Sequence, residues 1–365
     1  MPSSFLRERI VRCGPRAAQA DPARLGWRKL ILSSVVSPHF WSETVLRALQ
    51  AQLAVIVFSF LCAVTAPNPQ DQSESESTDP FVVVLGIAQD GGFPQAGCEK
   101  DCCRDAWSDS SKRRHVSCLA VVDPTSRQRW IIDATPDFKD QLRLLDELGP
   151  ADSNRGLTGI FLTHGHIGHY TGLMNLGHEA MGAKNVPVYV MPRMGEFLST
   201  NGPWDQLVRY KNIELREIVA DQPIQLNERI SVTPFRVPHR EEYTEVVGYR
   251  IDGPNGSVLF IPDIDKWERW DRRIEDLIAE VDVAYLDGTF YAEGELPNRD
   301  MADIPHPFIV ESMQRFESLP AQEKAKIRFI HLNHTNPALQ AGSAAREAVT
   351  DGGFSVAGEL ERVGL

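Results

Sequence analysis

Three histidines, His164, His166 and His169, lie within six residues, directly after the apolar run Ile160-Phe161-Leu162. The run predicts a short buried strand, whose rigid end would aim the following side chains into one space. Burying three imidazoles together is costly unless they share a ligand. Neutral imidazole binds zinc and other first-row metals well. The spacing therefore predicts a metal site, against the alternative of histidines that only hydrogen-bond inside a core.

Other candidate ligands also follow apolar runs that predict strands. A carboxylate or histidine at one strand end is usually only solvated, but several in one chain beside a histidine triplet favour a shared site. These additional candidates are Asp133, His239, Asp263, His331 and His334.

The order of the predicted elements favours a layered α/β sandwich over a regular doubly wound sheet, because strand pairs dominate first and helices are interspersed later. The predicted strands are 81–86, 117–122, 129–133, 159–163, 186–191, 213–220, 230–237, 246–252, 258–261, 281–286 and 326–332. The predicted helices are 138–148, 173–181, 194–200, 267–279 and 307–318.

The N-terminal part of the chain has a different character. Residues 53–66 form an apolar run of the length of a signal-peptide core, too short for a comfortable membrane span. We therefore divide the chain into a signal-like or anchoring extension (1–66), a polar linker (67–80) and a folded domain (81–365). This organisation predicts export to the periplasm or beyond, or membrane attachment through this segment alone. A translation start assigned too far upstream would instead leave the protein cytoplasmic.

The series of candidate ligands resembles the ordered motifs of the metallo-β-lactamase superfamily. Asp133 resembles the aspartate of the first motif, and His164, His166 and His169 resemble the histidines of the HxHxDH motif. In the same order, His239, Asp263 and His331 resemble the third-motif histidine, the metal-bridging aspartate and the last histidine. The resemblance implies a four-layer αββα sandwich, a metal-activated water, and one or two zinc ions, with manganese or iron as alternatives.

Three further stretches resemble the pyrroloquinoline quinone biosynthesis protein B family within that superfamily. They are Gly91-Gly92-Phe93-Pro94-Gln95, Asp287-Gly288-Thr289-Phe290, and the stretch from Phe329 to Pro337. This likeness covers the chain from about residue 81 to the C-terminus. It leaves two functions open: a metal-dependent hydrolase of unknown substrate, and a factor in the biosynthesis or transport of the quinone, with an oxygen-using or carrier role.

Gly168 departs from the superfamily motif, which has an aspartate before its last histidine. That aspartate normally binds the second metal, so its loss weakens the second position and leaves the first (His164, His166 and His239) complete. We expect either one tightly bound ion and a weak second one, or compensation by another group such as Asp287 or His334. Without the aspartate, His169 could also act on the substrate.

A cysteine cluster precedes this region. Cys98, Cys102 and Cys103 resemble the cysteine-rich loop that holds a structural zinc in many members of the quinone-biosynthesis family, with altered spacing. Cys118 is the expected fourth ligand or partner. A disulfide and free thiols are the alternatives, although adjacent cysteines rarely bond each other without strain.

The proposed chemistry is hydrolysis of a small molecule, with Asp263, His169 and His306 as candidate catalytic residues. His306 lies in a predicted loop and is either a proton donor or an ordinary surface histidine. The formal net charge of -12 argues against a nucleic-acid partner. A noncatalytic metal-binding domain is the third reading. The substrate and the oligomeric state have no sequence signature.

Overall fold

The computed structural model describes residues 78–148, 156–297 and 299–365. The predicted extension of residues 1–66 and most of the predicted linker lie outside the described residues. Within the described ranges, no helix combines the length and the apolar character needed to cross a membrane.

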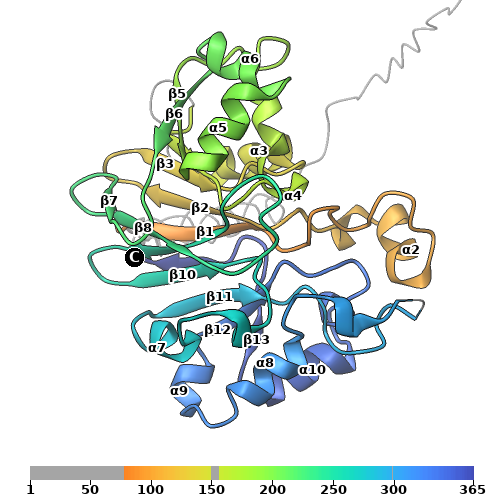
Figure 1. Cartoon of the computed structure of the whole chain (residues 1–365). Helices are drawn as coiled ribbons and strands as arrows, with labels where there is room; N and C mark the ends of the chain where they lie inside the picture. The colour runs from red at the N-terminus through yellow and green to blue at the C-terminus, as the bar shows by residue number, and fades with distance from the viewer. Residues whose placement is uncertain (1–77, 149–155, 298) are drawn as a thin grey trace, which may run out of the picture. The chain divides into compact units, whose positions relative to one another are not determined.

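Two seven-stranded sheets organise the described chain, and each has three antiparallel pairings on one side and three parallel pairings on the other (Figure 1). In the first sheet the strand order is β14 (Arg362–Gly364), β1 (Phe81–Gly86), β2 (Cys118–Asp123), β3 (Gln128–Ile132), β4 (Gly159–Phe161), β5 (Val186–Val190) and β6 (Ile213–Glu217).

The second sheet repeats this plan with the C-terminal strands. Its strand order is β13 (Ser355–Val356), β12 (Ile327–Ile330), β11 (Val283–Asp287), β10 (Ser257–Ile261), β9 (Val247–Asp252), β8 (Ser231–Arg236) and β7 (Ile224–Gln225).

Helices cover the outer faces of both sheets, as Figure 1 shows. The α-helices are α2 (Asp101–Ser108), α3 (Phe138–Leu148), α4 (Ile167–Tyr170), α5 (Pro192–Thr200), α6 (Trp204–Arg209), α7 (Ile274–Ala279), α8 (Ile309–Arg315), α9 (Ala321–Lys324) and α10 (Ala344–Asp351). Short 3-10 helices span Ser110–Lys112, Thr171–Leu176, Trp267–Arg269, Met301–Asp303 and Pro337–Leu339.

Strand β1 shows why the sequence adopts this layered arrangement. Val82 and Val84 pack into the core between the two sheets, while Val83 and Leu85 face the core beneath the helices of the first sheet. Successive side chains of a strand point to opposite faces, so a strand covered on both sides is apolar throughout. The predicted four-layer αββα sandwich is therefore confirmed, and Tyr249 of β9 packs edge-on against Phe161 of β4 across the interior.

Two predicted helices differ in the structure. The predicted helix 173–181 is a 3-10 helix over Thr171–Leu176, which ends where Gly177 adopts an extended conformation. The predicted helix 267–279 is split into Trp267–Arg269 and α7, with Trp270 extended between them.

The strand ends place the candidate residues at one edge of the sandwich. His164 follows β4, Asp133 follows β3, Asp263 follows β10 and His331 follows β12, and each side chain is buried. The carboxyl ends of neighbouring parallel strands meet at the same edge, which is where α/β sheets commonly place ligands.

Candidate metal centre

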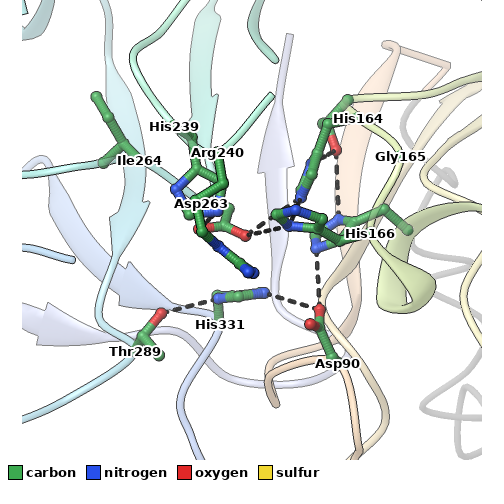
Figure 2. A network of polar contacts seen from close by, with 12 residues as sticks. Asp90, His164, Gly165, His166, His239, Arg240, Asp263, Ile264, Thr289 and His331 are labelled. Carbon is green, nitrogen blue, oxygen red and sulfur yellow. Dashed lines mark hydrogen bonds and ion pairs between the residues drawn. The ribbon is translucent and has the colours of Figure 1, made fainter. Parts of the chain in front are cut away.

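Figure 2 shows the first group of candidate ligands, formed by His164, His166, His239 and Asp263. Nε2 of His164 lies 2.9 Å from Nδ1 of His166 and 3.3 Å from Oδ2 of Asp263. Nε2 of His239 lies 3.1 Å from Oδ1 of Asp263. Ligands that sit roughly 2.0–2.1 Å from a tetrahedral zinc are about 3.3 Å apart. These atoms therefore already have the spacing of ligands around one ion.

A second group joins His169 and His331 to Asp90, a residue that was not among the predicted ligands. Oδ1 of Asp90 lies 3.2 Å from Nε2 of His169. The same oxygen lies 3.5 Å from Nε2 of His331, and Figure 2 draws this contact. Asp90 follows β1 in the loop Gln89-Asp90-Gly91-Gly92. The rule that selected Asp133 and Asp263, a carboxylate shortly after a buried strand, would also have found it.

Several inward-facing atoms in both groups make no hydrogen bond, although they are buried. Buried polar atoms are nearly always satisfied, so a cluster of unsatisfied ones needs an explanation. A metal ion explains it, because all of these atoms can donate a lone pair to one. They are Oδ1 of Asp90, Nε2 of His169, Nε2 of His239, Oδ1 of Asp263 and Nε2 of His331.

The outward-facing nitrogen of each histidine has a partner that fixes the ring. Nδ1 of His169 lies 2.7 Å from Asp133 and Nδ1 of His239 lies 3.0 Å from Asp265. Metal-binding histidines are usually oriented in this way by a carboxylate or a hydroxyl group. The other pairs are Nδ1 of His164 with Thr163, Nε2 of His166 with Glu242, and Nδ1 of His331 with Thr289.

Of these partners, only Asp133 was predicted from the sequence. The roles of Asp265, Glu242 and Thr289 could not be predicted, because the side chain that supports a histidine is set by loops that fold back from other elements. Asp133 and His331 also adopt positive φ angles of 72° and 65°, which are uncommon for non-glycine residues. Such backbone conformations cluster at functional sites, and here they turn the backbone sharply after the two strands that precede Asp133 and His331.

The electrostatics of the site bear on the binding of a cation. Burial would lower the pKa of His239, but Asp263 and Asp265 outweigh it and raise the pKa to about 10, so this imidazole must release a proton when it binds a metal. Burial and the neighbouring His169 hold the pKa of His164 well below its ordinary value, so this imidazole is neutral and able to bind a metal. Burial would raise the pKa of Asp263, but the charges of His239 and His306 hold it well below its usual range. Likewise, His169 and His331 outweigh burial and hold the pKa of Asp90 well below its usual range.

His306 is a buried residue of the site and not an ordinary surface histidine, which corrects that reading. Its Nδ1 lies 2.8 Å from Oδ2 of Asp287 and 3.3 Å from Oδ1 of Asp263. Burial lowers the pKa of His306, but the carboxylates of Asp287 and Asp263 outweigh burial and raise it above the ordinary value. The ring is therefore positioned to hold a proton beside the candidate metal ligands.

Asp287 lies with Asp263 and His306 in a further group that could hold an ion, and not in the group with His169 and His331. Its carboxylate accepts hydrogen bonds from the backbone N–H groups of Ile264 and Thr289 and from the Thr289 hydroxyl, and it contacts His306. It is thus committed to holding other residues of the site. His169 is fully buried with its free nitrogen toward Asp90, a position that favours a ligand role over direct action on a substrate.

His334 lies in the cysteine cluster, which corrects its expected place beside His331. The sulfur atoms of Cys98 and Cys102 are 3.7 Å apart, and Nδ1 of His334 lies 3.4 Å from the sulfur of Cys103. Thiolates at roughly 2.3 Å from a tetrahedral zinc are about 3.8 Å apart. A disulfide requires about 2.05 Å between sulfurs, so the structure has free thiols in a Cys3His arrangement.

Cys118 is not the fourth member of this cluster, and that expectation is also corrected. It lies on β2, fully buried, and its thiol donates to the Asp133 carbonyl. The cluster of three cysteines in one loop indicates that a fourth ligand comes from elsewhere in the chain, and His334 supplies it. Sequence alone could not choose between Cys118 and His334, since that choice depends on where α2 packs.

Comparisons with known proteins agree with this geometry. A family model described as "Beta-lactamase superfamily domain" matches residues 128–335. Curated proteins named coenzyme PQQ synthesis protein B are similar to the chain. The protein from Methylorubrum extorquens is 26% identical over 306 residues, covering 76% of this chain and 97% of the relative. The protein from Ruegeria pomeroyi is 28% identical, with the same coverage.

Solved structures show the same fold. The Zn(2+)-bound PqqB from Methylobacterium extorquens superposes with a TM-score of 0.66 at 24% identity, over 78% of this chain and all of the other. A diphosphatase from the PhnP family gives a TM-score of 0.54 at 21% identity, over 78% and 97% of the two chains. The chain belongs to the β-lactamase superfamily and has the metallo-β-lactamase fold of its PqqB-like members.

Proposed function

We propose that the protein is a metal-dependent hydrolase of a small molecule. One observation carries the proposal: imidazole and carboxylate atoms converge from several strand ends at the spacing of metal ligands, yet five of these buried atoms lack hydrogen-bond partners. His164, His166 and His239 would hold the first ion, with Asp263 beside them. A bound zinc would lower the pKa of its water toward about 7 and polarise the bond to be cleaved.

The residues around the ion have separate tasks in this proposal. Asp265 and Glu242 fix the rings of His239 and His166, so that the metal-facing nitrogens are held ready. His306, held by Asp287, is placed to give a proton to a departing group and to interact with Asp263. Manganese and iron also suit this mixture of ligands, so the metal itself is part of the test.

A cleft of about 500 Å³ opens beside the candidate metal site and offers a place for the substrate. His166 and Asp90 lie in its wall, next to four aromatic side chains and one arginine. The aromatic side chains are those of Tyr170, Phe197, Trp204 and Tyr243, and the arginine is Arg240. Pockets of this volume suit small molecules, and such a wall favours a substrate with a flat or apolar part and an anionic group.

The test is hydrolysis of a panel of ester, lactone and phosphodiester probes by the purified full chain. We expect turnover that is lost on chelation, restored by added Zn²⁺ or Mn²⁺, and lost in the His164→Ala variant. The Asp271→Asn variant is the matched control, since Asp271 is an exposed aspartate away from the site. Turnover that survives both chelation and the His164→Ala substitution would contradict the proposal.

A role in pyrroloquinoline quinone biosynthesis is the second candidate, favoured by the names of the relatives over three quarters of the chain. In this case the substrate or cargo would be the quinone or a precursor, and an oxygen-using iron site would be compatible with the ligands. Restoration of quinone production in a bacterium that lacks its own synthesis protein B would support this role. Absence of restoration together with probe hydrolysis would favour the first candidate.

Export or membrane attachment also stays a proposal, because it depends on residues outside the described ranges. Fractionation of cells that produce the full chain tests it. Recovery in the periplasm or the membrane fraction supports the proposal, and recovery in the cytoplasm contradicts it.

A further inference from the structure

We propose that Asp90 replaces the aspartate that the histidine motif lacks, so that the second metal position is complete and is built from a different loop. This inference rests on the proposed metal-dependent function and extends it from one ion to two. The second ion would be held by Asp90, His169 and His331. The sequence motif alone predicts a weakened position there, because Gly168 has no side chain.

The packing at Gly168 is the first argument. A Cβ atom at this glycine would lie 2.1 Å from Oδ1 of Asp90 and 2.6 Å from its Cα. The second distance involves the backbone, so a rotation of the Asp90 side chain cannot relieve the collision. Asp90 therefore occupies the space that a side chain at position 168 would need. The glycine and the aspartate are two parts of one arrangement, in which only one of the two positions can supply a carboxylate.

The surroundings of the Asp90 carboxylate are the second argument. Its Oδ1 is buried, approaches the free nitrogens of His169 and His331, and has no hydrogen-bond partner. A simple ion pair with a histidine would normally place the N–H on the line to the oxygen. Here three lone-pair donors face a common point without such a bond, which is the arrangement that a cation requires.

The attachment of the loop is the third argument. Gln89 donates its backbone N–H to Leu332 at 2.8 Å, Leu332 donates to Ile87 at 2.8 Å, and the Asn333 amide donates to the Gln89 side chain at 2.5 Å. These bonds tie the residues before Asp90 to the segment that follows His331. Two ligands from distant parts of the sequence are thereby held at a fixed separation.

The cysteine cluster fastens the same two segments a second time. Cys98, Cys102 and Cys103 follow Asp90 in the chain, and His334 follows His331 by three residues. A zinc bound there would tie residues 98–103, on the C-terminal side of Asp90, to the segment that follows His331. The carboxylate at position 90 would then be restrained on both sides, as a metal ligand from a loop requires.

The test compares metal content and thermal stability for four full-length proteins. They are the wild type, Asp90→Asn, the double variant Asp90→Gly with Gly168→Asp, and Asp271→Asn as the control. We expect Asp90→Asn, which keeps the shape of the side chain, to bind one ion fewer per chain than the wild type and to gain less thermal stability from added Zn²⁺. The double variant should not recover the lost ion, because a Cβ atom at position 168 would still lie 2.6 Å from the Cα atom of residue 90.

Cobalt substitution separates the ions, because Co²⁺ bound to thiolates absorbs in the near ultraviolet and Co²⁺ bound to histidine and carboxylate does not. In Asp90→Asn the thiolate band should stay at its wild-type strength while the total cobalt falls. An Asp90→Asn variant that binds as much metal as the wild type would overturn the inference and leave the proposed function intact. A wild type with no ion beyond the thiolate-bound one would overturn the proposed function itself.

Discussion

Oδ2 of Asp133 lies 2.7 Å from Nδ1 of His169, and both side chains are completely buried. Asp133 also accepts hydrogen bonds from the backbone and the hydroxyl of Thr163, the residue before the histidine motif. One carboxylate therefore fixes both the start of the motif and the ring of its last histidine. The free nitrogen of His169 is directed toward Asp90 as a result.

Replacing this carboxylate should weaken the second metal position. In Asp133→Asn the amide keeps the size of the side chain but no longer favours the ring orientation that presents Nε2 to a metal. Loss of such a supporting carboxylate typically lowers metal affinity by about 10- to 100-fold. Metal titration monitored by calorimetry, with Asp271→Asn as the control, measures the change. Equal affinities in wild type and variant would show that Asp133 has only a structural role.

The Cys3His cluster should hold a zinc that stabilises the fold. Cys103→Ser removes a buried thiol of the cluster, and we expect it to lose one zinc per chain and to unfold at a lower temperature than the wild type. Cys118→Ala is the matched control, since Cys118 is buried but lies outside the cluster. Zinc content and a thermal melt are the measurements. Zinc retained in Cys103→Ser, or lost in Cys118→Ala, would contradict this assignment.

Much of the site followed from strand ends in the sequence. His164, Asp133, Asp263 and His331 could be proposed because each comes directly after a buried apolar run, and the ends of such strands meet at one edge. The layered α/β sandwich was predictable from the order of strands and helices, and its four-layer form from the family resemblance. The run Phe81–Gly86 is apolar at every position, as a strand covered on both faces must be.

The rest depended on tertiary packing. Asp90 and His334 are supplied by loops, and their partners are decided by contacts between segments more than 200 residues apart, such as Cys103 with His334. From the sequence, Gly168 indicates that an aspartate ligand of the second metal is missing. In the structure, Asp90 fills the space beside Gly168 and brings a carboxylate to the same group of histidines.

A pH-dependent contribution to stability is expected from His115 and Glu359, away from the candidate metal ligands. Hydrogen bonding to Glu359 raises the pKa of His115 above its ordinary value of 6.5. A raised pKa means that folding favours the charged form, so the contribution is fully present below pH 6.5 and is lost as the pH rises through the folded pKa.

The Glu359→Gln variant tests this contribution, because glutamine can still accept the His115 backbone N–H that Glu359 binds at 2.6 Å. We expect its melting temperature to fall below that of the wild type at pH 6 and the difference to shrink at pH 9. Thermal melts at the two pH values measure the effect. A difference of equal size at both pH values would show that the charge of His115 is not involved.

The aromatic side of the cleft should contribute to substrate binding and not to the chemical step. Tyr243 is 62% exposed and lies against Phe197, with ring centroids 5.5 Å apart. Replacing it by alanine should raise KM for a hydrolysed probe several-fold and leave kcat close to the wild-type value. Tyr210→Ala, another exposed tyrosine that is not part of the cleft, is the control. A fall in kcat at unchanged KM would contradict this role.

The metal content of the purified full-length chain tests the central claim most directly. The proposal predicts two ions at the histidine and carboxylate groups, in addition to one at the Cys3His cluster. In this account His164→Ala removes an ion from the first group and leaves the thiolate-bound ion in place. A wild-type protein that binds metal only at its thiolates, and whose hydrolysis of probes is unaffected by chelation, would contradict the account.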